Sequence, residues 1–185
     1  RTENRLWRAL LGLTFWPMLF EKKALVTAFD RQPEMLRNNQ FYQTCQVDIE
    51  ERLQCLLDSA DPLLFFTQQC GRYYGKANGL FRWHPKLLDY IALFFEYADR
   101  QALVTVLRVM AKDFATYSDG FPDLMRVHQK QLMFEEIKAP GDSVRRNQLL
   151  TIRQLQRAGF TVTITQVEWF DDPQQAYVVV DVETT

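Results

Sequence analysis

Hydrophobic residues in the first part of the chain recur at the spacing of a buried helix. Over residues 2–16, Leu6, Leu10 and Leu13 form one face, and aromatic residues widen that face to most of the circumference. The polar, turn-rich stretch 29–48 predicts a loop. Further helical patterns follow over residues 49–59, 61–73, 85–97 and 99–115.

The pattern changes after residue 116, where short apolar runs replace the helical spacing. "LMRV" at 124–127 and "QLMFEEIK" at 131–138 flank a polar tip, and together they predict a β-hairpin. The alternation in "FTVTITQVEW", residues 160–169, predicts a further strand.

Between these strands, "APGD" interrupts the chain before another helical pattern over residues 144–158. Asp142 or Ser143 is expected to cap this helix, because a side-chain oxygen there accepts a hydrogen bond from the first turn. Gly159 is expected to end it, since glycine adopts the left-handed conformation that often follows a helix.

The order of helices first and then β-β-α-β predicts the α+β class. We expect a small mixed sheet flanked by helices, with an N-terminal helical portion. Residues 1–115 are assigned to the helical portion, in which residues 1–20 pack onto the core that follows. Residues 116–170 form that core. Residues 171–185 are expected to be a linker and the first strand of a truncated downstream domain.

Composition and charge limit the possible partners. The chain has 185 residues, 47% of them hydrophobic, and a formal net charge of -1, so an anionic partner must meet a local basic patch. The three cysteines, Cys45, Cys55 and Cys70, form no close pair and predict reduced thiols in a cytoplasmic protein. The apolar run 9–20 is too short for a bilayer, which predicts no membrane partner.

The expected strand 131–138 carries charged side chains on a face that should meet the core. Alternation places Glu136 and Lys138 on one face, and Glu135 and Ile137 on the other. Antiparallel pairing could bring Asp123, one hairpin upstream, beside Glu136. Two converging carboxylates suit Mg²⁺ or Mn²⁺, and a lysine beside them could orient water or stabilise charge on a phosphate. The alternative is a solvent-exposed Glu–Lys pair on an edge strand.

The segment "GFPDL…FEEIKAPGDSVRRNQ" resembles the VRR-NUC domain of the PD-(D/E)xK nuclease superfamily. That domain carries a G-x-P-D-L…E-V-K-G-P-x-D…x-Q series, from which this chain departs at Ile137 and Ala139. The resemblance implies a restriction-endonuclease-like core. It also implies catalytic roles for Asp123, Glu136, Lys138 and Gln148.

The segments "ENRLWRALLGLTFW", "GKANGLFRWH" and "VMAKDFATYSDGFPDL" resemble the Fanconi-associated nuclease family. This resemblance implies a metal site made by Glu3, Asp123, Glu136 and the carbonyl of Ile137, and holding Mg²⁺ or Mn²⁺. From the residues alone, Glu3 would be a first-turn glutamate that complements the helix dipole, and this alternative stays open.

The implied function is hydrolysis of DNA phosphodiester bonds, selective for 5′ flaps or branched DNA and serving repair. The implied setting is the bacterial cytoplasm, in association with the nucleoid. A monomer is expected, with a homodimer left open. Two other functions also stay open: a homodimeric resolvase that cuts Holliday junctions, and a non-catalytic DNA-binding module.

The expected helix 144–158 concentrates positive charge. Residues 141–160 hold four arginines against one aspartate, a local charge of +3. Phosphate contacts by Arg145, Arg146, Arg153 and Arg157 are one explanation, and a solvated helix face is the other. Helical spacing places Gln148, Leu149, Ile152 and Leu155 on the side that faces the sheet.

Two further features suggest nucleic-acid chemistry. Aromatic and basic residues are interleaved in a mixture that could stack on or brace DNA, or could serve packing alone: Arg72, Tyr73, Tyr74, Lys76, Phe81, Arg82 and Trp83. The end of the chain, "YVVVDVETT", resembles the first motif of DnaQ-like 3′–5′ exonucleases, with Asp181 and Glu183 as its acidic pair. A tail strand with chance acidic residues is the alternative.

Overall fold

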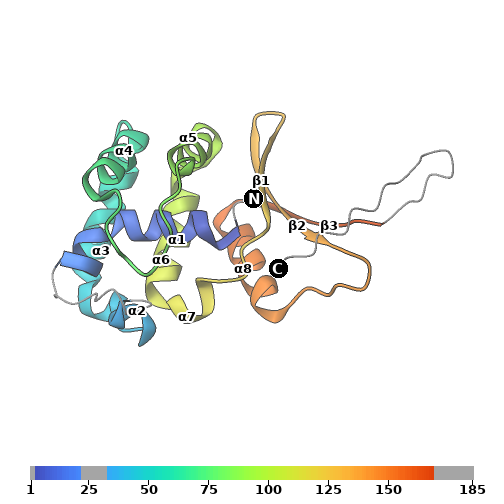
Figure 1. Ribbon diagram of the computed structural model, residues 1–185, viewed down its shortest axis with the longest axis horizontal. Helices are drawn as coiled ribbons and strands as arrows, with labels where there is room; N and C mark the ends of the chain where they lie inside the picture. Colours follow the sequence, from blue (N-terminus) through green and yellow to red (C-terminus); the bar gives the residue numbers. More distant parts are fainter. Residues whose placement is uncertain (1–2, 22–32, 169–185) are drawn as a thin grey trace, which may run out of the picture.

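Helices occupy most of the described residues, and a small sheet follows them in the sequence (Figure 1). The computed structural model describes residues 3–21 and 33–168. The helical part comprises α1 (Glu3–Thr14), a π-helical turn (Pro17–Glu21), α2 (Glu34–Arg37), α3 (Phe41–Asp58), α4 (Pro62–Tyr73), α5 (Leu87–Tyr97), α6 (Arg100–Lys112) and α7 (Phe114–Tyr117). The sheet part comprises β1 (Leu124–His128), β2 (Gln131–Lys138), α8 (Arg146–Ala158) and β3 (Thr161–Gln166).

The sheet has the strand order β1-β2-β3, with β2 in the centre. β1 pairs with β2 in the antiparallel sense, and β3 pairs with β2 in the parallel sense, so the sheet is mixed. α8 connects the parallel pair, and its buried face packs against the sheet and α6. The predicted α+β class, with a small mixed sheet flanked by helices, is confirmed.

The predicted loop 29–48 is wrong at Glu34–Arg37, which form α2, and from Phe41 onward, where α3 already begins. Phe41 is fully buried, and its ring lies 5.6 Å from the ring of Phe15. Cys45 has non-helical dihedral angles (φ −121°, ψ 23°). The resulting kink interrupts the regular helical spacing of apolar residues. The mostly polar segment before it therefore gave no helical pattern, although it is helical and packs on the core through one buried aromatic residue.

The start of α8 also differs from the prediction, because neither Asp142 nor Ser143 caps it. The Asp142 carboxylate instead accepts a hydrogen bond from the Ala139 amide (3.3 Å), which closes the turn after β2. Gln148 takes over the capping role, since its Oε1 accepts from the Arg145 amide (3.0 Å). Gly159 ends the helix in the left-handed conformation (φ 109°), as predicted.

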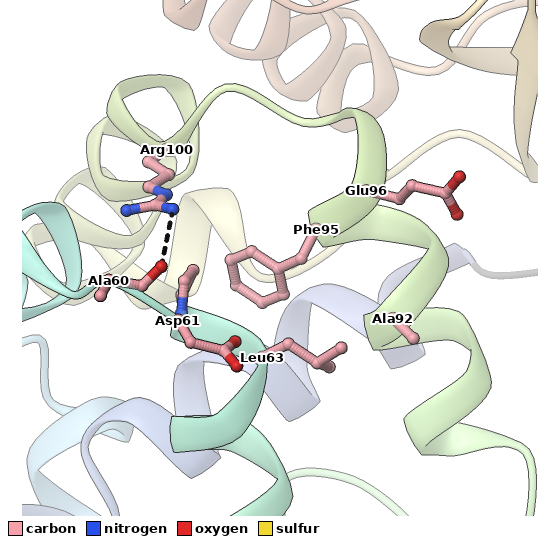
Figure 2. A pocket seen from close by; sticks show the side chains of 8 residues that line it. Ala60, Asp61, Leu63, Ala92, Phe95, Glu96 and Arg100 are labelled. Atoms are coloured by element: carbon pink, nitrogen blue, oxygen red, sulfur yellow. Dashed lines mark hydrogen bonds between the residues drawn. The ribbon is translucent and has the colours of Figure 1, made fainter.

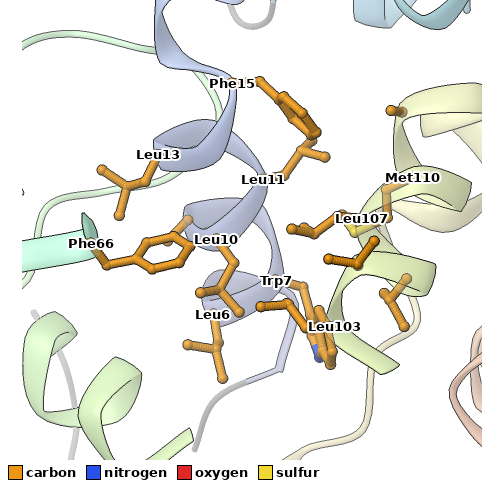
Figure 3. Close-up of a cluster of buried hydrophobic side chains, with 14 of the residues drawn as sticks. Leu6, Trp7, Leu10, Leu11, Leu13, Phe15, Phe66, Leu103, Leu107 and Met110 are labelled. Atoms are coloured by element: carbon orange, nitrogen blue, oxygen red, sulfur yellow. The ribbon is translucent and has the colours of Figure 1, made fainter. Parts of the chain in front are cut away.

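Trp7 joins the helical part to the sheet. Its ring stacks on Phe121 at 5.1 Å and lies 5.6 Å from the rings of Phe94 in α5, Phe134 in β2 and Phe160 before β3. Around it, α1 directs apolar side chains toward α6 on one side and toward α4 on the other (Figure 3). The first helix therefore contacts both parts of the molecule.

Several of the sequence-based expectations concern thiols, membranes and the C-terminal segment. None of Cys45, Cys55 and Cys70 forms a disulfide among the described residues, and burial raises the pKa of the Cys70 thiol to about 11. Among the helices described, none has the length and apolar character needed to cross a bilayer. The domain boundaries stay a prediction. The predicted linker and strand 171–185, with Asp181 and Glu183, lie outside the described residues.

Replacing Trp7 by alanine should destabilise the helical part and the sheet together. The ring is 1% exposed, and we expect a loss of about 3–5 kcal/mol in the free energy of unfolding. Tyr74→Ala is the control, because that ring is 65% exposed and should change stability by less than about 0.5 kcal/mol. Denaturant titration measures the loss, and hydrogen exchange locates it. Unchanged protection in α5 alongside lost protection in β2 would contradict this coupling.

Candidate active site

The central strand β2 buries a carboxylate and an ammonium group on one face. Glu136 is 2% exposed and Lys138 is 9% exposed, and they follow the core residue Phe134 on that same face. Glu135 lies on the opposite face, where it forms an ion pair with Arg126 (3.1 Å) and accepts from the Thr165 hydroxyl. The two adjacent glutamates therefore have different environments.

Glu136, Lys138 and Gln148 form a closed set of polar contacts. Lys138 Nζ lies 2.9 Å from Glu136 Oε1 and donates to Gln148 Oε1, also at 2.9 Å. Gln148 Nε2 donates to the same Glu136 oxygen. Gln148 thus bridges the two charged groups with its amide while it caps the helix on which it lies.

Asp123 approaches this set from the start of β1. Leu124 pairs with Glu135, so the residue before it lies at the level of Glu136 across the antiparallel pair. The Asp123 Oδ2 atom accepts a hydrogen bond from the Ile137 amide at 3.1 Å. This contact fixes the carboxylate beside the strand that carries Glu136 and Lys138.

These side chains open onto a polar cavity of about 200 Å³. The cavity is lined by Asn4, Asp119, Gly120, Phe121, Asp123, Glu136, Ile137, Lys138, Arg145 and Gln148. Glu136 Oε2 is buried there and has no hydrogen-bond partner among the described residues. A buried carboxylate oxygen without a partner is costly, and hard cations such as Mg²⁺ and Mn²⁺ take oxygen ligands of this kind. The donor set therefore fits a divalent metal ion.

Of the remaining predicted metal ligands, Ile137 lines the cavity and Glu3 is the first residue of α1. The side chain of Glu3 lies outside the described part, so its role as a ligand stays a prediction. Its neighbour Asn4 does line the cavity, which places the start of α1 at the site. Within the side chains that the structure describes, no three His, Cys, Asp or Glu residues gather around a common centre.

Two cavity residues, Asn4 and Asp119, were not predicted from the sequence. The Asp119 carboxylate accepts from Asn4 Nδ2 and from Asn147 Nδ2 (3.1 Å), and so links the first turn of α1 to the first turn of α8. Asn4 Oδ1 in turn accepts from the Phe121 amide (3.0 Å). The sequence gives only a weak signal for this bridge, because Asp119 lies in a turn-forming cluster far from both partners.

The predicted DNA-binding arginines occupy two kinds of position. Arg145 lines the cavity, whereas Arg146, Arg153 and Arg157 are exposed along α8 and do not line it. Their contact with DNA stays a prediction.

The buried face of α8 differs from the prediction at one position, because Leu149 is 38% exposed. Thr151 takes its place, and its hydroxyl donates to the Asp119 carbonyl at 2.8 Å. Thr151 lies three residues after Gln148 and four residues before Leu155. These side chains therefore share the face of the helix that meets the sheet and α6.

A larger cavity of about 390 Å³ lies between the start of α4 and the end of α5 (Figure 2). Its charged groups serve helix ends: Arg100 donates to the carbonyls of Ser59 and Ala60, and Asp61 accepts from the Leu64 amide. Glu96 points away from Asp61. No pair of carboxylates converges there, so this cavity does not offer the chemistry of the β2 site.

Comparison with known proteins connects this site to a family. The profile of the VRR-NUC domain matches residues 72–169, a range that begins within α4. A Fanconi-associated nuclease 1 homologue of Arabidopsis thaliana is 26% identical over 175 residues, which cover 90% of this chain and 19% of the relative. A homologue of the same name in Dictyostelium discoideum is 24% identical over 186 residues, with 90% and 17% covered.

Solved structures show that the fold is shared. The crystal structure of paFAN1 bound to 5′-flap DNA with a 1-nucleotide flap and a gap superposes with a TM-score of 0.80 at 23% identity. A second structure, with a 2-nucleotide flap, gives 0.78 at 22% identity. Each match covers 92% of this chain and 32% of the other. The chain thus spans about a fifth of the curated relatives and a third of these solved chains.

Gly120 brings the loop before β1 into close contact with α8. Its φ of +80° lies in the left-handed region, and an added Cβ would lie 2.8 Å from the backbone of Asn147 and Gln148. Gly141 has a similar φ of +85° but has no atom within 4 Å of that position. The two glycines therefore differ in the available space and share the backbone conformation.

Gly120→Ala should destabilise the chain more than Gly141→Ala. Both variants place a side chain in the left-handed region, at about 1–2 kcal/mol each. Only Gly120→Ala also displaces the first turn of α8, which should add about 1–3 kcal/mol. Chemical denaturation of both variants measures the difference. Equal losses would show that the backbone of α8 does not constrain this loop.

Proposed function

The chain belongs to the VRR-NUC domain family, and on that basis we propose that it is a divalent-metal-dependent DNA nuclease. It hydrolyses phosphodiester bonds in 5′-flap or other branched DNA during repair, in the bacterial cytoplasm and at the nucleoid. The observation that carries the proposal is the buried Oε2 of Glu136, which has no hydrogen-bond partner in the part of the chain that the structure describes and shares one polar cavity with Asp123 and Lys138.

Glu136 and Asp123 would hold Mg²⁺ or Mn²⁺, together with the Ile137 carbonyl and Glu3. When bound, the ion supplies charge neutralisation at the phosphate and lowers the pKa of coordinated water. Glu136 Oε1 is already engaged by Lys138 and Gln148, so Oε2 is the atom that can serve as ligand. The contacts to Oε1 keep the carboxylate in one orientation and leave Oε2 available.

Lys138 would orient the attacking water or stabilise negative charge on the phosphate. An ammonium group has three N–H donors, and contacts to Glu136 and Gln148 use two of them. The third donor can then be directed toward the cavity. Gln148 acts through these neighbours, because its amide fixes the carboxylate and the ammonium group relative to each other.

Arg145 at the cavity, with Arg146, Arg153 and Arg157 along α8, would contact the phosphates of the bound strand. The two paFAN1 complexes, whose bound DNA carries a 5′ flap, support the proposed flap preference. Because the chain spans only part of those proteins, substrate selection by the whole protein is proposed here on the likeness of the fold. We propose that the chain acts as a monomer.

Separate replacement of the two adjacent glutamates by glutamine tests the proposal. Glu136→Gln should lower Mn²⁺-dependent cleavage by at least about 10²-fold, because it removes a ligand from the polar cavity. Glu135→Gln makes the same chemical change on the opposite face and should retain activity within a few-fold. Cleavage is measured on a labelled panel of flaps, four-way junctions and plain duplex.

The panel also separates the alternatives. Preferential cutting of junctions by a dimer would favour a resolvase over a flap nuclease. DNA binding by the wild type without Mn²⁺-dependent cleavage would leave only a non-catalytic binding module. Isothermal titration with Mn²⁺ gives a second measurement, in which Glu136→Gln should weaken binding and Glu135→Gln should not.

A further inference from the structure

The connection between α4 and α5, residues 74–86, has a defined shape although it contains no helix or strand. Such long connections are uncommon in compact domains unless they serve a function. The buried side chain of Asn78 accepts from the amides of Leu80 and Phe81, both at 2.9 Å. Trp83 Nε1 donates to the Lys76 carbonyl at 2.8 Å. These contacts hold the loop in one conformation before any ligand arrives.

This region carries positive charge only. Between Pro62 and Leu88 the sequence holds Arg72, Lys76, Arg82 and Lys86, and it holds no aspartate or glutamate. All four basic residues are exposed. The whole chain has a formal net charge of -1, so this local excess is available to an anionic partner.

Tyr74 adds an aromatic surface to the basic loop. Its ring is 65% exposed, and it is the one aromatic residue among the large hydrophobic side chains that are exposed in the described ranges. The ring lies 5.5 Å from that of half-buried Trp83, which in turn packs 4.9 Å from Phe81 and 6.0 Å from Trp16. Tyr74 therefore packs against Trp83 on one side and is open to solvent over most of its surface.

The loop crosses α1, whose first turn lies at the active site (Figure 1). An added Cβ on Gly12 would lie 2.9 Å from the Phe81 ring, so the two segments are in contact there. Asn4 and Gly12 are eight residues apart on a helix, which corresponds to about 12 Å. A nucleic-acid strand carries one phosphate per ~3.4 Å, so this separation equals a few nucleotides.

Two acidic residues border this surface: Glu21 acts on Tyr73, and Asp89 follows Lys86 by three residues in the first turn of α5. Burial and the negative charge of nearby Glu21 raise the pKa of Tyr73, the buried tyrosine beside Tyr74. Arg72 and Lys76 lie over the Tyr73 ring at 5.3 Å and 5.0 Å. These two carboxylates oppose the four cations of Arg72, Lys76, Arg82 and Lys86, so positive charge is in excess.

We propose that the loop 74–86, with Arg72, is a second nucleic-acid contact of this chain and binds a single-stranded DNA arm. A base stacks on Tyr74, and the four basic side chains contact the adjoining phosphates. The assignment of DNA as the ligand rests on the proposed function. The surface itself is separate from the carboxylate cavity, so each can be tested without the other.

The first test is binding of fluorescein-labelled dT12 to the full chain in EDTA, followed by fluorescence anisotropy. Tyr74→Ala should weaken binding about 5- to 150-fold, the range that corresponds to loss of one stacked base. Tyr74→Phe should bind as the wild type does, and Tyr74→Leu should bind as weakly as Tyr74→Ala. Leu64→Ala, which truncates a 51%-exposed side chain on α4, is the matched control and should have no effect.

The salt dependence tests the phosphate contacts. The double variant Lys76→Gln/Arg82→Gln should reduce the slope of log Kd against log salt by about 1.4, or about 0.7 for each lost contact. Arg37→Gln removes an exposed charge from α2 and should leave the slope unchanged. An unaltered slope in the double variant would show that these cations do not meet phosphate.

The outcomes separate this surface from the proposed activity. If Tyr74→Ala binds dT12 as tightly as the wild type does, or if the wild type does not bind dT12, the proposed DNA contact is wrong. This holds even if Mn²⁺-dependent duplex cleavage is intact. If the wild type does not cleave DNA, the proposed nuclease activity is wrong. A loss of dT12 affinity in Tyr74→Ala would still support the proposed DNA contact in that case. Circular dichroism of each variant confirms that the fold is retained.

Discussion

The contacts of Trp7 determine how the first helix lies against the sheet, and the site depends on that arrangement. The ring packs against Phe134, which precedes Glu136 by two residues on the same face of β2. One face of a single strand thus passes from the hydrophobic core into the polar cavity. Because side chains on that face are about 6–7 Å apart, an error in the packing of Trp7 is transmitted directly to the carboxylate.

The cavity holds charges at a depth where charges are usually avoided. Moving an ion pair out of water is costly, and loss of one partner from a buried pair costs about 3–5 kcal/mol. Gln148 and Lys138 satisfy one oxygen of Glu136 and leave the other without a partner among the described residues. This incomplete compensation is unfavourable for folding alone. It makes sense if the second oxygen is kept for a cation.

Local patterns allowed part of this arrangement to be predicted. Strand alternation separated Glu136 from Glu135, and composition located the hairpin, α8 and its final glycine. The bridge from Asn4 through Asp119 to Asn147 could not be predicted, because its partners are up to 115 residues apart and each lies in an ordinary polar segment. The start of α3 was missed because polar residues surround the single buried ring of Phe41. The role of Glu3 rests on family resemblance alone.

Gln148 has two roles, and the combination limits which residues evolution can accept at that position. A glutamate there could cap α8, but it would place a further carboxylate against Glu136. An asparagine is one methylene shorter and could not span the same three partners, Arg145, Lys138 and Glu136. A leucine would fill the space but would remove one acceptor from the ammonium group and leave the Arg145 amide without its cap. A substitution at this position would therefore change the start of the helix and the chemistry of the site at the same time.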